Sequence, residues 1–515
     1  MKKSIRILSG VCALATLFTS VAFAGCSKED PSKTLYIDIS NAGYGIEWLN
    51  PLKETFENEH EGYTVKISSI TKGDNEYLDK ATSGSAETDI FFIETNVAAR
   101  FDMPITANGT KYDSAFEDLT SLYNTKIPGE DKTIAQKMES TYLAFNTHNG
   151  KNYTIPWVTS MQGILVNKKL WKAEWGTFPN TTDEFFAFMD SIKSLTTPFI
   201  YSLSDSYWED IYDVWAYQYN GKAEMDQYWQ GYDNNGERYT PELFLNDGVL
   251  EALKVLDKLV KKSNGYASSL SYTLSFTSVQ NKFLEGDDNI LMCPTGAWIE
   301  REMEANYDPE ELDIEFVKMP VISALGTKLG ITDTELSQVI DYIDGESETA
   351  PTFASTKGLT NEQVIEKVRE ARSFVASNNL HASFIPVYST KKDLAKEFLQ
   401  LMCSDRGIER ILSVNGCKPP LEFDIENSSI KNQMSDFAIS TQKMIESSKF
   451  YFSKKDVFFN KNNLTYVNNI PAGTATKAFA AENSKDYQDA QTVWSNNYTY
   501  VEGRWANFMR TAGLS

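Results

Sequence analysis

Apolar segments that alternate between two periodicities constrain the fold of this chain most. Three segments have the apolar content of strands, and the residues between them recur at helical spacing. The predicted strands are residues 34–40, 63–70 and 89–93. The third strand, DIFFI, is apolar almost throughout, which is typical of a parallel strand covered on both faces. This strand–helix–strand order predicts a doubly wound α/β sheet.

The loops that follow these strands form the first candidate site. In a doubly wound sheet, ligands bind beyond the carboxyl ends of the strands. The polar or aromatic candidates in these loops are Asn41, Tyr44, Asp74, Glu94 and Asn96. A carboxylate suits such a site because it accepts strong hydrogen bonds. Turn formation and ordinary solvated surface are the alternative roles for these residues.

Length and charge limit the classes of protein to consider. The chain has 515 residues, of which 41% are hydrophobic and 23% charged. This is the composition of a globular protein, and the length calls for about two or three domains. The net charge is −22. A surface of this sign repels nucleic acid and anionic lipid headgroups, so neither is an expected partner.

The first 26 residues have the three parts of a secretory signal. Basic residues come first, an apolar run follows, and small residues lead to Cys26. This end resembles a bacterial lipoprotein signal, which implies removal of residues 1–25 and lipidation of Cys26. Residues 26–33 would be the lipidated N-terminus and a polar linker. An ordinary cleaved signal and an uncleaved anchor are the alternatives.

Lipidation would place the protein on the outer face of the bacterial cytoplasmic membrane, on the extracellular or periplasmic side. Roles that depend on ATP or NAD are disfavoured there. The sequence also contains no G-x-S-x-G, H-E-x-x-H or P-loop motif. We therefore expect neither an enzyme nor a cofactor.

Cysteine and histidine are too sparse and too scattered to predict a metal site. There is no C-x-x-C motif, and the three histidines lie far apart in the sequence. Beyond Cys26, the cysteines are Cys293, Cys403 and Cys417. A disulfide between Cys403 and Cys417 and three buried free thiols are both consistent with this pattern.

Local signals predict further elements along the chain. Thr181 with Glu184 has the spacing of a capping box. Residues 246–262 carry an apolar helical face, and Asn235-Gly236 is typical of a hairpin turn. Residues 323–384 read as an insertion with two helices, which start at Thr332 and Thr360.

Several short stretches, taken in order, resemble the extracellular solute-binding proteins of bacterial ABC importers. The branch is the one that contains the maltose-binding protein. The stretches are residues 48–57 (WLNPLKETFE), 89–92 (DIFF), 155–157 (IPW) with 163–170 (GILVNKKL), 292–298 (MCPTGAW), 318–321 (KMPV) and 394–399 (LAKEFL).

This resemblance implies a type II periplasmic-binding-protein fold. Each of two lobes would be a doubly wound α/β sheet with helices on both faces, and a ligand cleft would lie between the lobes. The first lobe would comprise residues 34–157 and 319–404. The second would comprise residues 158–318 and 405–515.

The resemblance also points to aromatic site residues. A sugar presents apolar faces and many hydroxyls, so its site needs flat rings and fixed polar groups. Trp298 follows the Thr295-Gly296 turn, and the family's tryptophan at this turn stacks on sugar. Trp157 lies at the first crossing between the lobes, and Thr159 and Ser160 follow it. Packing in the core or at the hinge is the alternative for both tryptophans.

A further aromatic and a carboxylate lie in the second predicted lobe. Trp208 and Asp210, in the stretch SYWED, would supply a stacking ring and a hydrogen-bond acceptor. Their alternative roles are in a helix cap and in the core.

Taken together, the resemblance implies a monomeric, lipid-anchored receptor that delivers a mono- or oligosaccharide to the permease subunits of an ABC importer. No bond is made or broken in that role. Two other functions remain open: a secreted glycan-degrading or glycan-binding lipoprotein, and a receptor for a peptide or a polyol.

Overall fold

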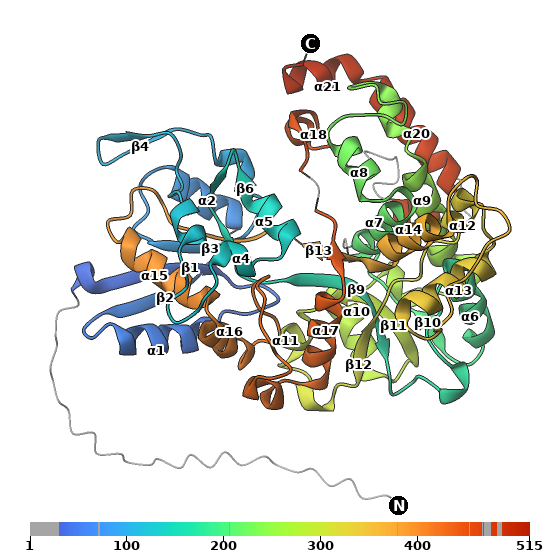
Figure 1. Ribbon diagram of the computed structural model, residues 1–515, viewed down its shortest axis with the longest axis horizontal. Coiled ribbons are helices and arrows are strands. Elements are labelled where there is room, and N and C mark those ends of the chain that lie inside the picture. The colour runs from blue at the N-terminus through green and yellow to red at the C-terminus, as the bar shows by residue number, and fades with distance from the viewer. Residues whose placement is uncertain are drawn as a thin grey trace, which may run out of the picture.

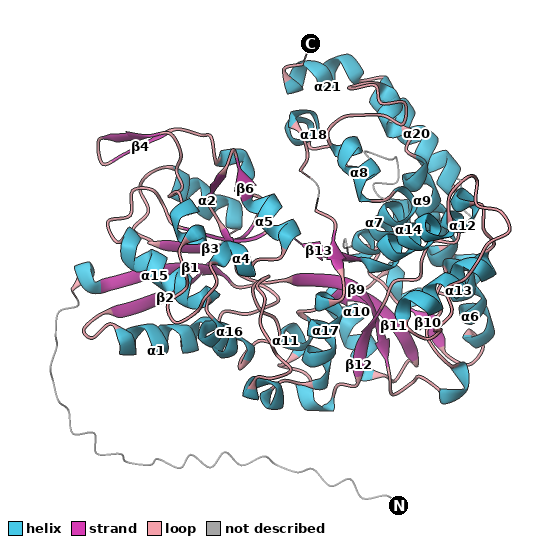
Figure 2. Ribbon diagram, viewed as in Figure 1, coloured by secondary structure: helices cyan, strands magenta, loops and turns pink. Residues whose placement is uncertain are grey.

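Two α/β lobes lie side by side (Figures 1 and 2). The structure is a computed structural model that describes residues 30–70, 73–204, 207–378, 380–452, 454–465, 467, 475–480 and 487–514. Cys26 and the predicted signal lie outside these residues. Among the described helices, none has the length and apolar content needed to cross a membrane.

The sheet of the first lobe has five strands. Their order is β2 (Thr64–Ile70), β1 (Thr34–Ser40), β3 (Ile90–Glu94), β14 (His381–Phe384) and β8 (Ile155–Pro156). The first three are parallel, whereas β14 is antiparallel to both β3 and β8. The predicted β-α-β-α-β order is confirmed.

Helices cover both faces of this sheet because β2 and β3 lie on opposite sides of β1. The chain passes through α1 (Leu49–Glu59) to β2 and returns through α2 (Asp74–Thr82) to β3. Right-handed crossovers in opposite directions place the two helices on opposite faces. The side chains of β3 accordingly alternate between two apolar clusters: Ile90 and Phe92 pack with α1, and Phe91 and Ile93 pack with α2.

Short elements complete the first lobe. They are β4 (Ile105–Ala107), β5 (Thr110–Tyr112), α3 (Thr120–Asn124), α4 (Ile134–Lys137), α5 (Ser140–Asn146), β6 (Thr147–His148), β7 (Lys151–Asn152), α15 (Lys392–Cys403) and α16 (Asp405–Leu412).

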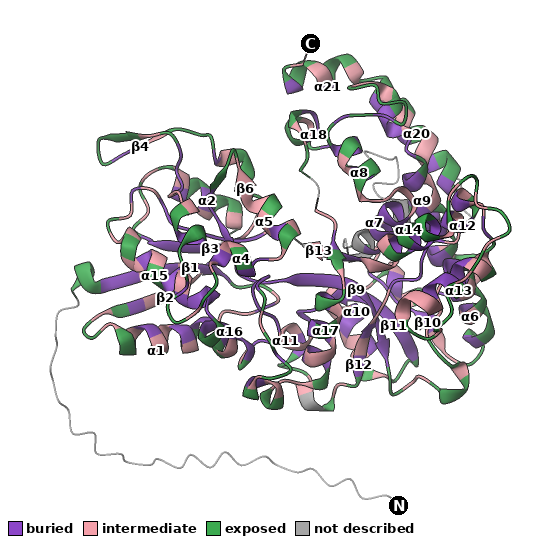
Figure 3. Ribbon diagram, in the orientation of Figure 1, coloured by how far each residue is buried: buried purple, intermediate pink, exposed green. Residues whose placement is uncertain are grey.

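The sheet of the second lobe is built around β9 (Ser160–Asn167). Its order is β10 (Thr197–Phe199), β11 (Ile290–Gly296), β9, β13 (Phe374–Asn378) and β15 (Lys449–Phe450), and β12 (Ile314–Val317) also pairs with β9. All eight residues of β9 are buried, as are the seven of β11 (Figure 3). A strand with partners on both edges and helices on its faces has no exposed side.

Helices surround this second sheet. They are α6 (Thr182–Ile192), α7 (Tyr207–Asn220), α8 (Lys222–Trp229), α9 (Asp247–Val260), α10 (Phe276–Glu285), α11 (Ile299–Met303), α12 (Ala324–Leu329), α13 (Asp333–Asp344), α14 (Asn361–Ser373), α17 (Asp436–Glu446), α18 (Val457–Asn462), α19 (Ala475–Ala480), α20 (Ala490–Glu502) and α21 (Trp505–Ala512).

Local capping signals predicted several helix starts correctly. Thr181, Thr332 and Thr360 each form a capping box at the start of α6, α13 and α14, respectively. Asn246 caps α9 by accepting a hydrogen bond from the amide of Val249 at 3.1 Å. The Asn235-Gly236 turn is closed by an antiparallel bridge between Tyr232 and Arg238.

The chain crosses between the lobes along adjacent segments. It leaves the first sheet at β8 and enters the second at β9, and it returns between β13 and β14. The strands at the ends of these two crossings are hydrogen-bonded to each other in both sheets. Ser377 is opposite Met161 in the second sheet, and Ser383 is opposite Ile155 in the first. A third crossing follows α16, where the carbonyl of Lys418 accepts a hydrogen bond from the amide of Thr159 at 2.7 Å.

The packing divides the chain differently from the expected residue ranges. Helices α12, α13 and α14 contribute to the core of the second lobe through residues such as Leu336, Val364 and Val368. Residues 319–373 therefore lie with the second lobe, and the stretch 318–321 is no crossing, since Val321 bridges Thr181. Helix α16 packs on α1 of the first lobe, so that lobe extends past residue 404.

One apolar cluster joins the two lobes along the side of α1, α11, α16 and α17. It includes Trp48 from the first lobe and Phe316 from the second. Cys293, Cys403 and Cys417 are buried free thiols, so the 403–417 disulfide does not form. Burial raises the pKa of Cys403 and of Cys417 to about 12, which keeps both thiols protonated at neutral pH.

A largely buried ion pair fastens α14 to α13. The guanidinium of Arg372 donates to Asp344 from Nε at 3.0 Å and from Nη2 at 2.8 Å, and Lys318 Nζ lies 2.8 Å from the same carboxylate. Burial alone would raise the pKa of Asp344, but Arg372 and Lys318 hold it below its usual value. The carboxylate therefore stabilises the folded state only while it is ionised.

We expect Arg372→Ala to lower the free energy of unfolding by about 3 kcal/mol at neutral pH, because it leaves Asp344 buried with one partner fewer. The loss should shrink as the pH falls through the depressed pKa of Asp344, where wild type also loses the pair. Urea unfolding measures both effects. The matched control is Arg369→Ala on the same helix, whose partner Glu366 is exposed and whose loss should stay below about 1 kcal/mol. Equal losses in the two variants would contradict this account.

Candidate functional site

A cavity of about 640 Å³ lies between the two lobes. The first lobe lines it from the loop after β1, from the end of β3 and from the start of β14. These residues include Asn41, Tyr44, Glu47, Glu94 and His381. The second lobe lines it from β9, α10 and α11. Its residues are Gln162, Phe276, Trp298, Arg301, Glu302 and Glu304.

Trp298 connects β11 to α11, and two glycines make room for its indole. A Cβ on Gly296 would lie 2.2 Å from the six-membered ring, and a Cβ on Gly43 would lie 2.7 Å from the five-membered ring. Real Cβ atoms do not approach other atoms so closely, so the ring fits only where both of these positions are glycine. Gly43 belongs to the first lobe, and the indole therefore lies across the junction of the lobes.

Tyr44 is the centre of an aromatic group that reaches from the cavity into the core. Its ring contacts Trp298, His381 and Trp157 edge-on, with centroids 5.8, 5.4 and 6.1 Å away. Trp157 stacks on Trp48 at 5.4 Å and donates from Nε1 to the carbonyl of Ile93 at 3.4 Å. Trp157 thus supports the cavity from the core and does not line it.

Several buried polar atoms around the cavity have no hydrogen-bond partner within the protein. They include Tyr44 Oη, Glu94 Oε1 and His381 Nδ1. Glu94 Oε1 and His381 Nε2 are 3.5 Å apart, an ion-pair distance without hydrogen-bond geometry. An unpaired buried polar atom costs about 1–3 kcal/mol. Such groups concentrated around one cavity indicate a place where water or a ligand completes the hydrogen bonds.

Arg301 ties the two lobes together at the rim. Its guanidinium pairs with Glu47 from the loop after β1 and with Glu304 one turn further along the chain. Further inside, Gln280 Nε2 donates to Glu302 Oε2 at 2.9 Å. Burial raises the pKa of Glu302, and the nearby Glu94 carboxylate raises it further.

Two other predicted site residues, Asp74 and Asn96, lie in the same strand-end loops but not in the lining of the cavity. Asp74 accepts hydrogen bonds from the hydroxyl of Ser40 and, at 2.9 Å, from the amide of Glu94, so it holds the strand-end loops in place. Asn96 accepts from the amide of Ala98 at 3.0 Å in a local turn. The same loops thus contain both cavity-lining residues and residues that only shape them.

Thr159 and Ser160 are buried in the first crossing. Both of their hydroxyl oxygens lack a hydrogen-bond partner within the protein. Trp208 and Asp210 belong to the first turn of α7, and their side chains lie outside the part that the structure describes. Of the eleven predicted residues, Trp298, Tyr44, Asn41 and Glu94 line the cavity.

Sequence reasoning missed Glu47, Phe276, Arg301, Glu302, Glu304 and His381, and it did not select Gln162. Arg301 and Glu302 lie three and four residues after Trp298. A helix that starts at Trp298 therefore places both of them on the same face as Trp298. That spacing was a usable sequence signal. The sequence gives no such signal for His381, because only the pairing of β14 with β3 brings it opposite Glu94.

Among the described residues, no cluster of His, Cys, Asp and Glu could hold a metal ion.

We expect Gly296→Ala to displace the indole of Trp298 and to lower the free energy of unfolding by about 1–3 kcal/mol, as overpacking does. Denaturant unfolding measures the loss. Gly163→Ala is the matched control. Gly163 lies on β9, opposite Thr295 of β11. A Cβ added to Gly163 would lie 3.4 Å from the ring of Phe316, which is an ordinary contact distance. A similar loss in the control would show that the tight indole packing is not the cause.

Glu302→Gln should raise the melting temperature at neutral pH. The raised pKa means that ionisation of Glu302 favours the unfolded chain, so wild type loses stability as the pH rises through that pKa. The gain from the neutral amide should vanish below about pH 4, as the carboxyl becomes protonated in both the folded and the unfolded state. Thermal unfolding across this pH range tests the sign. Glu304→Gln, which removes a partner of Arg301, should give no gain, and a pH-independent gain for Glu302→Gln would contradict the argument.

The comparisons with known proteins agree with this architecture. The sequence matches the family of bacterial extracellular solute-binding proteins over residues 52–422. No curated protein sequence matches the chain significantly. Among solved structures, the GacH receptor of Streptomyces glaucescens aligns with a TM-score of 0.57 at 14% identity, over 92% of this chain and 98% of that chain.

Two further structures are similar. Maltose-bound MalE3 of T. maritima has a TM-score of 0.56 at 12% identity, over 91% of this chain and 99% of that chain. RafE in complex with raffinose has a TM-score of 0.54 at 16% identity, with the same coverage. At these identities the structural likeness shows the two-lobed fold alone. The family match spans most of the sequence, and this chain belongs to the bacterial extracellular solute-binding proteins.

Proposed function

We propose that the protein is a receptor that binds a mono- or oligosaccharide between its lobes and delivers it to the permease of an ABC importer. Cys26 would be lipidated and would tether the receptor to the outer face of the cytoplasmic membrane. The observation that carries this proposal is the interlobe cavity, in which a tryptophan and buried polar atoms without partners face the same space. The family of the chain and the saccharides named in the similar structures support it.

The lining residues can contact both the apolar faces and the hydroxyl groups of a sugar. Trp298 and Tyr44 would contact the apolar C–H faces, and Asn41, Glu94 and Gln162 would bind hydroxyl groups. His381 and Glu302, which the structure adds to the candidates, would also bind hydroxyl groups. A sugar hydroxyl both donates and accepts, so it can satisfy the carboxylate of Glu94 and the phenol of Tyr44 alike.

The charges of the cavity favour an uncharged ligand over an anionic one. Four glutamates line it, and Arg301, the lining guanidinium, already pairs with Glu47 and Glu304. A carboxylate or sulfate on the ligand would therefore meet like charges in a partly buried space. We propose a neutral saccharide and expect uronates to bind much more weakly.

Ligand binding would stabilise the closed arrangement of the lobes, which the permease would recognise. Trp298 and the Glu47–Arg301 pair join the two sides of the cavity, so they would respond to closure directly. No chemical reaction is part of this role, and the ligand would leave unchanged.

The test is a thermal-shift screen of residues 27–515 with raffinose, maltose, an oligogalacturonate, a peptide mixture and a polyol. A neutral oligosaccharide should raise the melting temperature in proportion to saturation and should be recovered intact. Trp298→Ala should abolish the shift. Trp175→Ala is the matched control, because Trp175 packs on Trp171 and Phe188 away from the cavity, and it should keep the shift.

Other outcomes would overturn parts of the proposal. Hydrolysis of the glycan would indicate an enzyme, and a shift with only the peptide or the polyol would replace the ligand class. An oligogalacturonate that binds as tightly as a neutral sugar would contradict the charge argument. A full shift in Trp298→Ala would place the site elsewhere.

A further inference from the structure

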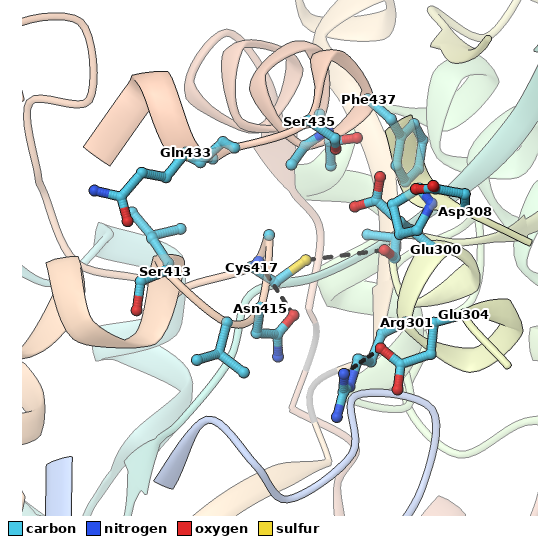
Figure 4. Close-up of a pocket in the computed structure, with 18 of the residues that line it drawn as sticks. Glu300, Arg301, Glu304, Asp308, Ser413, Asn415, Cys417, Gln433, Ser435 and Phe437 are labelled. Atoms are coloured by element: carbon cyan, nitrogen blue, oxygen red, sulfur yellow. Dashed lines mark hydrogen bonds and ion pairs between the residues drawn. The ribbon is translucent and has the colours of Figure 1, made fainter. Parts of the chain in front are cut away.

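A second cavity, of about 390 Å³, lies on the other side of α11 (Figure 4). Helix α11 forms one wall, the loop after α16 forms another, and the start of α17 forms the third. Figure 4 shows Glu300 and Asp308 on the α11 side, Asn415 and Cys417 on the loop, and Phe437 on α17. The volume is within the range of small-molecule sites.

Helix α11 separates this second cavity from the interlobe cavity. Glu300 lines the second cavity and Glu302 lines the interlobe cavity, while Arg301 and Glu304 border both. Residues two positions apart on an α-helix point to opposite sides. The two spaces are therefore distinct, and a substitution at Glu300 or Glu302 can address one without the other.

Two buried polar atoms at the second cavity lack hydrogen-bond partners. They are Oε1 of Glu300 and Oγ1 of Thr441. Thr441 is only 1% exposed and belongs to the lining. Gly416 also lines this cavity and packs closely on α17, since a Cβ there would lie 2.6 Å from Cβ of Ala438. A carboxylate oxygen and a hydroxyl, both without partners at one cavity, point to a ligand that donates hydrogen bonds.

The charged side chains around the second cavity favour a positively charged ligand. Glu300, Glu304 and Asp308 are in its lining, and Arg301 is the cationic side chain among the lining residues. Arg301 already pairs with Glu304 and with Glu47 from the first lobe. Burial raises the pKa of Glu300, as expected for a carboxylate that lacks a cationic partner.

We infer that the second cavity binds a small organic cation, with a primary ammonium group against the carboxylate of Glu300. An ammonium group donates three hydrogen bonds, which matches the unpartnered oxygens of Glu300 and Thr441. The short apolar chain of such a ligand would pack on Phe437 and Leu412. A metal ion fits less well, because no group of three or more potential ligands comes together among the described residues.

This inference does not depend on the ligand of the interlobe cavity. It concerns other residues and a ligand of other chemistry, so it stands or falls separately.

Isothermal titration calorimetry with putrescine tests it on residues 27–515. We expect a saturable heat for putrescine and none for glycerol, which has hydroxyl groups but no charge. Glu300→Gln removes the charge at nearly constant shape and should weaken putrescine binding by at least about tenfold. Glu302→Gln is the matched control on the same helix and should bind putrescine as wild type does.

Thr441→Val supplies a second variant that alters the cavity without touching α11. It should weaken putrescine binding by a smaller factor than Glu300→Gln, since it removes one neutral hydrogen bond. Thermal unfolding of each variant verifies that it is folded. The inference is overturned if putrescine gives no saturable heat, or if Glu300→Gln binds it as tightly as wild type while Glu302→Gln does not.

Discussion

The pairing of two crossing segments is the constraint on which the arrangement of the molecule depends. β8 and β14 are neighbours in the first sheet, and β9 and β13 are neighbours in the second. The same two stretches of chain are thus held together by backbone hydrogen bonds at both ends of the crossing. Neither sheet can move without carrying these strands along. Any rotation of one lobe relative to the other would therefore take place about these crossings.

The site follows from this constraint. The carboxyl ends of β1 and β3 face the second lobe, and the crossing from β8 to β9 aligns them with β11 and α11. Trp298 then packs against Gly296 of its own lobe and Gly43 of the other. Local sequence supplies the glycines and the ring, but only the paired crossings bring Gly43 and Gly296 to the same indole.

Sequence reasoning succeeded where the structure is local. The strand at 34–40, the helix after it and the capping boxes at Thr332 and Thr360 depend on neighbouring residues, and they are as predicted. Trp298 was selected because it follows the Thr295-Gly296 turn and because the family resemblance implies a sugar-stacking tryptophan at this turn, and it lines the cavity. The residues that line the cavity beside it from the first lobe, such as His381, depend on a pairing between strands almost 300 residues apart. No local pattern encodes that contact.

The lobe boundaries show the same limit. The apolar faces of α13 and α14 were visible in the sequence. An amphipathic pattern predicts that a helix packs on a core, but it does not indicate which of two sheets the helix covers. Arg372 and Asp344 fasten these helices to each other, and Leu336 and Val364 join the core of the second lobe. The segment therefore enlarges the second lobe.

The acidic side chains of α11 lie beside both cavities. The chain is strongly acidic, yet the glutamates of α11 are more than solubilising surface, because Glu300 and Glu302 are largely buried on opposite sides of one short helix. Burial raises the pKa of both, so both weigh against folding in the absence of a partner. Carboxylates with perturbed pKa values are enriched at functional sites. On the side of the interlobe cavity, Gln280 and a hydroxylated ligand would share Glu302. On the other side the hydroxyl of Ser435 donates a hydrogen bond to Glu300. Oε1 of Glu300 still has no partner within the protein, and the ammonium group of the proposed ligand would complete it.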